Sequence, residues 1–228
     1  QYEEKFITGT LTKERLDLMQ RFLKLWKKTP WTIKEFDWVL NSLSKAGSLI
    51  NFEDQRKILL LADVIAVQKR LRLKIEELSA IMDMIPKFSF ESGQKGFFER
   101  LFNLGDMFVN NPKIIVAGTN LSHLLAGLSI TEHELNLLLP LIGVDTTVPA
   151  SVTKQNLSQL YRQCRLASGL RLSIEEFISA VNVVLQTGEV KTLIQITQLI
   201  DNKNWIDTTP FNFLQLDCII NGRVNQDN

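Results

Sequence analysis

One pattern recurs along the sequence: a long amphipathic helix, a tight turn, and a short helix that opens on a capping box. In residues 153–172, apolar side chains recur every three or four positions, which is the spacing of one helix face. Ser173 follows, and Glu176 lies three residues later, the spacing at which serine and glutamate side chains cap a helix start. Helices of this kind must bury one face against a neighbouring helix.

The same spacing predicts helices along most of the chain. We expect long helices at residues 12–28, 54–73, 113–128, 153–172 and 190–203. We expect shorter ones at 75–85, 97–102, 129–142 and 209–220, and others after Thr32 and Ser173. Asp207 or Thr208 is the expected cap of the last helix, with Pro210 in its first turn, where the missing N–H does no harm.

The predicted fold is all-α, an irregular array of antiparallel helix pairs with no significant sheet. The 11 Gly and 6 Pro residues are too few for the many turns of a β-sandwich. Asn221-Gly222 lacks the alternating flanks of a hairpin, so no strand pair is expected. In the first helix we expect Leu16, Met19, Leu23 and Trp26 to form the buried stripe.

The short helices open on similar boxes, which suggests an internal repeat. The boxes are Ile33–Phe36, Ile75–Leu78, Ile130–Leu135 with an insertion, and Ile174–Phe177. A true repeat and ordinary capped hairpins both explain them. The chain begins at Gln1, so we expect residues 1–228 to be a fragment of a larger helical shell domain, with parts at about 10–85 and 98–222 joined by a polar loop at 86–97.

A search for chemistry predicts no catalytic, cofactor-binding or metal-ligating residue. His123 and His133 lie ten residues apart and do not form the His-Glu-x-x-His spacing of a zinc site. Cys164 and Cys218 lie 54 positions apart on separate predicted helices, which favours free, buried thiols over a disulfide. No nucleophile elbow or phosphate-binding glycine loop is present; the sequence therefore predicts a protein that is not an enzyme.

Charged side chains are expected to stabilise helix ends. Glu76-Glu77 and Glu175-Glu176 lie in first turns, where carboxylates offset the positive end of the helix dipole. The basic residues of 24–28 and 69–74 are expected on solvated faces. With 26 basic and 25 acidic residues, the chain lacks the charge of a nucleic-acid-binding protein. Residues 1–100 hold 18 basic and 14 acidic side chains and the rest hold 8 and 11, which could steer an acidic partner or neighbouring subunit.

Aromatic and apolar residues are expected in helix packing. Trp26, Trp31, Trp38 and Trp205 cluster at helix ends, which favours packing between helices over a ligand cage. The longest apolar stretches, 58–67 and 135–144, are too short to cross a membrane, so no membrane insertion by these residues is expected.

Three groups of phrases follow one another along the chain. They are Leu23–Trp26 with Trp31–Trp38, Phe98–Asn103, and Leu157–Arg162 with Leu166-Ala167 and Leu172–Phe177. Together they resemble the α-helical shell of the A component of bacterial Tc insecticidal toxin complexes, which repeats a Leu-Tyr-Arg helix, a Leu-Ser box and an aromatic-x-x-Leu-Phe-Asn element. The resemblance covers about residues 11–220. Phe98 replaces the family's more usual Tyr, the 86–96 loop is short and polar, and no stretch is long enough for the large domains that interrupt the shell in family members.

The resemblance implies a large, secreted, bell-shaped homopentamer. Such a protein binds a receptor or glycan on the target cell, inserts a central channel, and delivers a toxic enzyme supplied by its B and C partners. This chain would form part of the outer shell, at the bacterial cell surface or after secretion, without catalytic residues or cofactors. The helix pairs alone also fit a free-standing helical-repeat adaptor that holds a peptide or protein along a concave face.

Overall fold

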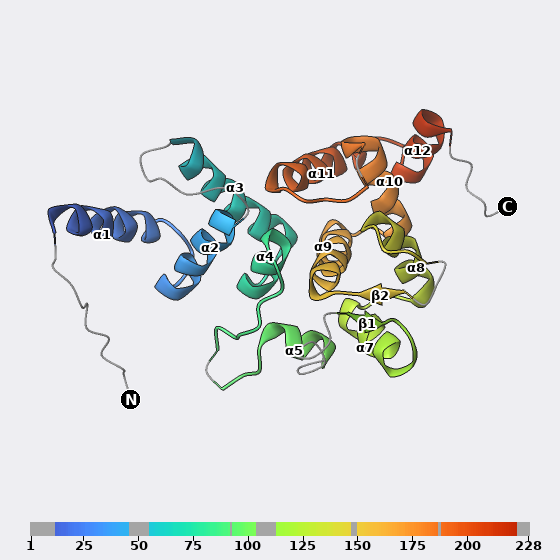
Figure 1. The fold of residues 1–228 in the computed structure, drawn as a ribbon. Helices are drawn as coiled ribbons and strands as arrows, with labels where there is room; N and C mark the ends of the chain where they lie inside the picture. Colours follow the sequence, from blue (N-terminus) through green and yellow to red (C-terminus); the bar gives the residue numbers. More distant parts are fainter. Residues whose placement is uncertain are drawn as a thin grey trace.

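The computed structural model describes residues 12–45, 55–91, 93–103, 113–146, 150–186 and 188–222, and most of these residues are helical (Figure 1). The all-α prediction is confirmed. The helices are α1 (Lys13–Trp26), α2 (Ile33–Lys45), α3 (Gln55–Leu71), α4 (Ile75–Met82), α5 (Phe97–Phe102), α7 (Gly118–Leu128), α8 (Glu132–Leu141), α9 (Lys154–Leu170), α10 (Ile174–Leu185), α11 (Leu193–Ile206) and α12 (Phe213–Asn221). Among the described residues, no helix has the length and apolar character needed to cross a bilayer.

A two-stranded antiparallel sheet corrects the expectation of no strand pair. Strand β1 (Ile114–Ile115) pairs with β2 (Ser151–Val152), with Ile114 opposite Val152, and both of these side chains are buried. Two-residue strands are too short to show an alternating pattern in the sequence. The helix predicted from residue 113 therefore begins only at Gly118, after β1.

The predicted capping boxes are present. Thr131 with Glu134 and Ser173 with Glu176 cap α8 and α10 in both directions. In three of the turns that precede a short helix, a non-glycine residue adopts the left-handed conformation: Arg72, Ser129 and Arg171, with φ between 52° and 57°. Each of these three residues is followed directly by an apolar residue: Leu73, Ile130 and Leu172. Ile130 is therefore equivalent to Leu73 and Leu172, and its predicted equivalence to Ile75 and Ile174, which begin the other boxes, is wrong.

The last helix pair begins and ends later than predicted. Thr192 caps α11, which runs to Ile206, and Asn212 caps α12 in place of Asp207 or Thr208. The Asn212 side chain accepts the Gln215 N–H at 2.9 Å, and the Gln215 side chain accepts the Asn212 N–H at 3.0 Å. Asn and Gln thus form the same box that Ser and Glu form elsewhere.

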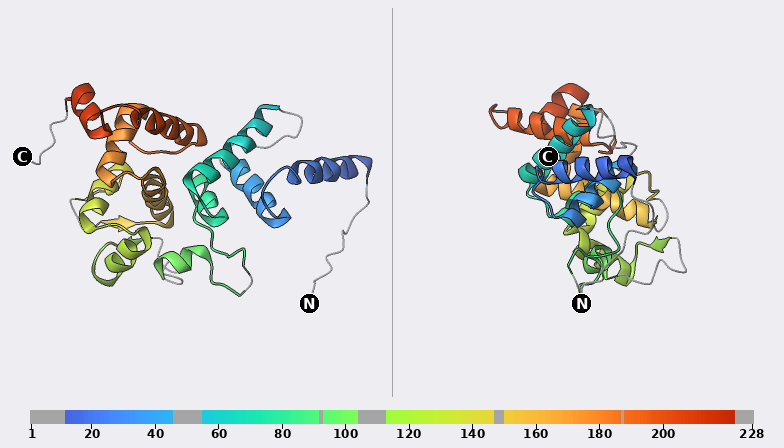
Figure 2. Two further views of the ribbon diagram at one scale, coloured as in Figure 1. Left: turned by 180° about the vertical axis from the view of Figure 1, so that it is seen from behind. Right: turned by 90° about the vertical axis from the view of Figure 1, so that its left-hand side faces the viewer.

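Helix α9 lies at the centre of the packing. It contacts α3, α4, α7, α8, α10 and α11, so both predicted parts of the chain meet on it (Figures 1 and 2). Its apolar side chains Leu157, Leu160, Leu166 and Ala167 are wholly or almost wholly buried. The described residues of the predicted polar loop are helix-free up to Gly96, and Phe97 begins α5. Phe88 and Phe90 pack their rings against Trp38 of α2, with the Phe88 centroid 4.2 Å away.

The predicted buried stripe of the first helix is wrong. No residue of α1 is buried, and Leu16, Met19 and Leu23 are exposed. Helix α1 lies at one end of the array and α12 at the other (Figure 1, and the left view of Figure 2). Only Phe22, Leu25 and Trp26 of α1 pack partly against the core. The helical periodicity therefore indicated an apolar face that no described residue covers.

Trp26 provides a test of how firmly α1 is held. Complete burial of its ring would make Trp26→Ala cost about 3 to 5 kcal/mol. The ring is half-buried, and its Nε1–H donates to the Trp31 carbonyl oxygen at 2.7 Å. We expect Trp26→Ala to lower the free energy of unfolding by about 2 kcal/mol, measured by urea denaturation. A loss below about 0.5 kcal/mol would show that α1 is detached in solution.

Candidate functional site

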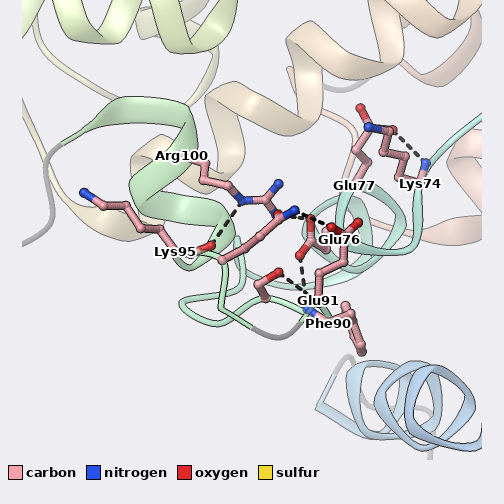
Figure 3. A network of polar contacts seen from close by, with 9 residues as sticks. Lys74, Glu76, Glu77, Phe90, Glu91, Lys95 and Arg100 are labelled. Atoms are coloured by element: carbon pink, nitrogen blue, oxygen red, sulfur yellow. Dashed lines mark hydrogen bonds and ion pairs between the residues drawn. The ribbon is translucent and has the colours of Figure 1, made fainter.

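The first acidic pair, Glu76-Glu77, forms ion pairs that tie α4 to two other helices. Figure 3 shows the contact of Glu76 with Arg100 and that of Glu77 with Lys74. Glu76 pairs closely with Arg100 of α5 and accepts the Phe90 N–H at 3.3 Å. Glu77 accepts the Lys74 N–H at 2.7 Å and pairs with Arg165 of α9 through Nε at 2.9 Å. Each carboxylate therefore contacts an arginine and a backbone donor, and through them it joins α4 to its neighbours.

The second acidic pair meets one of the two histidines. Glu176 accepts the Ser173 N–H at 3.0 Å as part of its capping box. Glu175 lies 3.5 Å from His133 Nε2, and both side chains are at least half exposed. An exposed pair of this kind contributes little to stability.

His123 is held apart from His133. Its Nδ1–H donates to the Phe102 carbonyl oxygen at 2.9 Å, which joins α7 to the end of α5. Among the described residues, no three His, Cys, Asp or Glu side chains lie close enough together to hold a metal ion.

The two cysteines differ in exposure. Both are free; Cys164 is buried in α9, but Cys218 is exposed on α12, so the prediction that it is buried is wrong. Burial raises the pKa of the Cys164 thiol from 9.0 to about 12. At neutral pH it is protonated and is a poor nucleophile.

Thiol labelling checks this difference. At pH 8, we expect a disulfide reagent such as Ellman's to modify Cys218 rapidly in the folded protein and Cys164 only after unfolding. Because the folded Cys164 keeps its proton to a higher pH than the unfolded one, its contribution to stability is present below pH 9 and is lost as the pH rises towards 12. Cys218→Ser is the control, and rapid labelling of that variant would contradict the buried position of Cys164.

A cavity of about 330 Å³ borders the buried Cys164 thiol. Its lining includes Tyr161 and Cys164 beside the Glu77–Arg165 ion pair. Burial and the nearby Glu77 carboxylate raise the pKa of the Tyr161 hydroxyl. Phenol and thiol both stay protonated at neutral pH, so neither of these two groups is an activated nucleophile.

A cavity of about 560 Å³ has five basic residues in its lining. Its basic residues are Arg70, Arg72, Arg165, Arg171 and Lys203. Helices α3, α9 and α11 all end beside it, so these cations lie where three helix C-termini concentrate negative partial charge. Arg70 also pairs with Asp201 of α11 at 2.9 Å, and the cluster therefore holds helix ends together.

Part of this basic cluster was predicted from the sequence to lie on a solvated helix face, and the cavity beside it was not predicted. A usable signal was the repeated Leu-Arg-Leu at 71–73 and 170–172, which places Arg72 and Arg171 at the same point of two helix pairs. That match predicts two arginines at neighbouring helix ends, but it does not predict that the ends converge.

The remaining candidate is an apolar surface. Leu18, Met19, Phe22 and Leu23 of α1 line an open groove of about 480 Å³ that has no polar residue in its lining. Contiguous exposed apolar surface of this kind is typical of protein–protein contacts. No known family model matches the chain, and no curated protein matches it.

Proposed function

We propose that this chain is a structural part of the α-helical shell of a Tc-type toxin A component, without enzymatic activity. The observation that carries the proposal is a stack of capped helix pairs whose end helices, α1 and α12, carry uncovered apolar side chains. Helical-repeat proteins in solution normally close their terminal repeats with polar faces. Apolar faces at both ends favour a section of wall that continues on either side.

The described polar groups agree with a structural role. The carboxylates, histidines and arginines singled out above cap helices or join them, and the buried thiol is protonated. The ordered sequence motifs that resemble those of the shell family also support the proposal. As part of that shell, the chain would contact other subunits of a homopentamer, while its B and C partners and a host receptor or glycan would bind the parent protein.

The complete reading frame tests this proposal. We expect a gene that encodes a chain of thousands of residues with a channel-forming region, expressed as a secreted or surface-bound product. A stop codon soon after Asn228, with no such region upstream, would refute the proposal and favour the free-standing adaptor.

A further inference from the structure

The first and last helix pairs align without a gap at an offset of 180 residues. Thr12 caps α1 and Thr192 caps α11, and both helices have 14 residues. The turns that follow contain Thr29-Pro30 and Thr209-Pro210 at the same positions.

Their turns are also built by the same hydrogen bonds. The Thr29 hydroxyl donates to the Trp26 carbonyl oxygen at 2.8 Å, and the Thr209 hydroxyl donates to the Ile206 carbonyl oxygen at 2.9 Å. In the second helices, Asn41 donates to the Asp37 side chain at 3.4 Å, and Asn221 donates to the Asp217 side chain at 2.6 Å. The pairs α1–α2 and α11–α12 are therefore the same structural unit.

Equivalent positions of the two units differ sharply in exposure. Ile196 and Leu199 are 3% and 1% exposed, because α11 packs against α3, α9 and α10. Their equivalents Leu16 and Met19 are 52% and 44% exposed. Phe213 is 2% exposed, and its equivalent Ile33 is 48% exposed. We call Leu16, Met19 and Ile33 the leading face.

The opposite side of the unit shows the reverse. Val39 is wholly buried where α2 packs towards α4, whereas its equivalent Ile219 is 68% exposed on α12. One unit thus contacts the helix pair that follows it, and the other contacts the pair that precedes it. The face that α1–α2 leaves exposed is therefore the face that α11–α12 buries, and the reverse holds for the opposite face.

Charge indicates what the leading face binds. Residues 12–41 carry seven basic and four acidic side chains, whereas residues 192–221 carry one basic and three acidic. Asp201 of α11 pairs with Arg70 of α3; its equivalent in α1 is Arg21, which pairs with Asp17 of the same helix at 2.8 Å. A partner that sits on α1 as α3 sits on α11 should therefore present a carboxylate where α3 has Arg70. Two α1 helices packed together would bring like charges into contact.

We propose that the leading face is the binding site of a further capped helix pair, which packs on α1–α2 as α9–α10 and α3 pack on α11–α12. The contacting face of this partner is apolar and has acidic flanks, with a carboxylate opposite Arg21. The proposal goes beyond the toxin assignment and rests on the internal repeat, so it can hold even if the parent protein belongs to another family.

A transplant within the full 228-residue chain tests the proposal. Residues 192–221 are replaced by the sequence of residues 12–41, which places the leading face on the surface that α11–α12 normally covers. We expect one cooperative unfolding transition, with a Tm within about 10 °C of the wild type, and slow hydrogen exchange in the transplanted helix. Adding Arg70→Glu should raise the Tm of this chimera by about 2 °C, because the transplant brings an arginine opposite Arg70.

Two further variants keep the result decisive if the chimera does not fold. The triple substitution Ile196→Leu, Leu199→Met and Phe213→Ile transfers only the leading-face side chains, and we expect it to shift the Tm by less than about 8 °C. A matched variant with Ile196→Glu and Leu199→Glu should lose exchange protection in α11. Rapid exchange in α11 of the triple variant would overturn the proposal. So would a wild-type homodimer in sedimentation that Leu16→Glu abolishes, because the face would then bind a copy of itself.

Discussion

Replacing Ile196 and Leu199 together with alanine should lower the free energy of unfolding by at least about 4 kcal/mol. Each side chain is almost wholly buried between α11 and its neighbours, and truncation of a buried Ile or Leu costs about 2 to 5 kcal/mol. The two positions share one face, so their effects need not add. Urea denaturation followed by circular dichroism measures the loss.

The matched control is the equivalent pair in α1. Leu16→Ala with Met19→Ala should change the free energy of unfolding by less than about 1 kcal/mol, because both side chains are exposed and alanine favours the helix. Equal losses in the two double variants would contradict the exposed position of the leading face.

Gln163→Leu should lower the free energy of unfolding by about 3 kcal/mol. The Gln163 side chain is wholly buried in α9; its Nε2–H donates to the Val190 carbonyl oxygen at 3.2 Å, and its Oε1 accepts the Val190 N–H at 3.3 Å. Leucine fills a similar volume but leaves both buried backbone groups of Val190 unpaired, at about 1 to 3 kcal/mol each.

Gln159→Leu is the control for this substitution. Gln159 lies one turn earlier in α9, is half-buried, and donates to the side chain of Glu189 at 3.3 Å. Its loss should cost less than about 1 kcal/mol, because no backbone group loses a partner. A stability change below 1 kcal/mol in the Gln163→Leu variant would contradict the buried hydrogen bonds to Val190.

Local signals in the sequence predicted most helices and their caps. Thr131 with Glu134 and Ser173 with Glu176 form the predicted boxes, because a capping box depends only on residues three positions apart. The last helix pair was predicted too early along the chain, because Asn212 and Gln215 form its capping box in place of the more familiar Ser and Glu. The sequence showed that Glu76-Glu77 begins a helix; its arginine partners, Arg100 and Arg165, lie too far along the chain to be predicted.

Tertiary contacts account for what the sequence could not predict. Periodicity marked Leu16 and Met19 as an apolar face, but it does not say whether another helix covers that face. The prediction that Cys218 is buried failed for the same reason. The strands β1 and β2 are two residues each and pair across a long stretch of chain, so neither length nor spacing indicated them.

Electron cryo-microscopy of the complete gene product that contains these residues tests the central claim most directly. We predict a fivefold particle in which residues 12–222 lie in an outer helical wall around a channel, with further helix pairs packed on the leading face and on Ile219 of α12. A small monomer, or a particle in which both apolar faces remain open to solvent, would contradict the proposal that this chain is a section of wall.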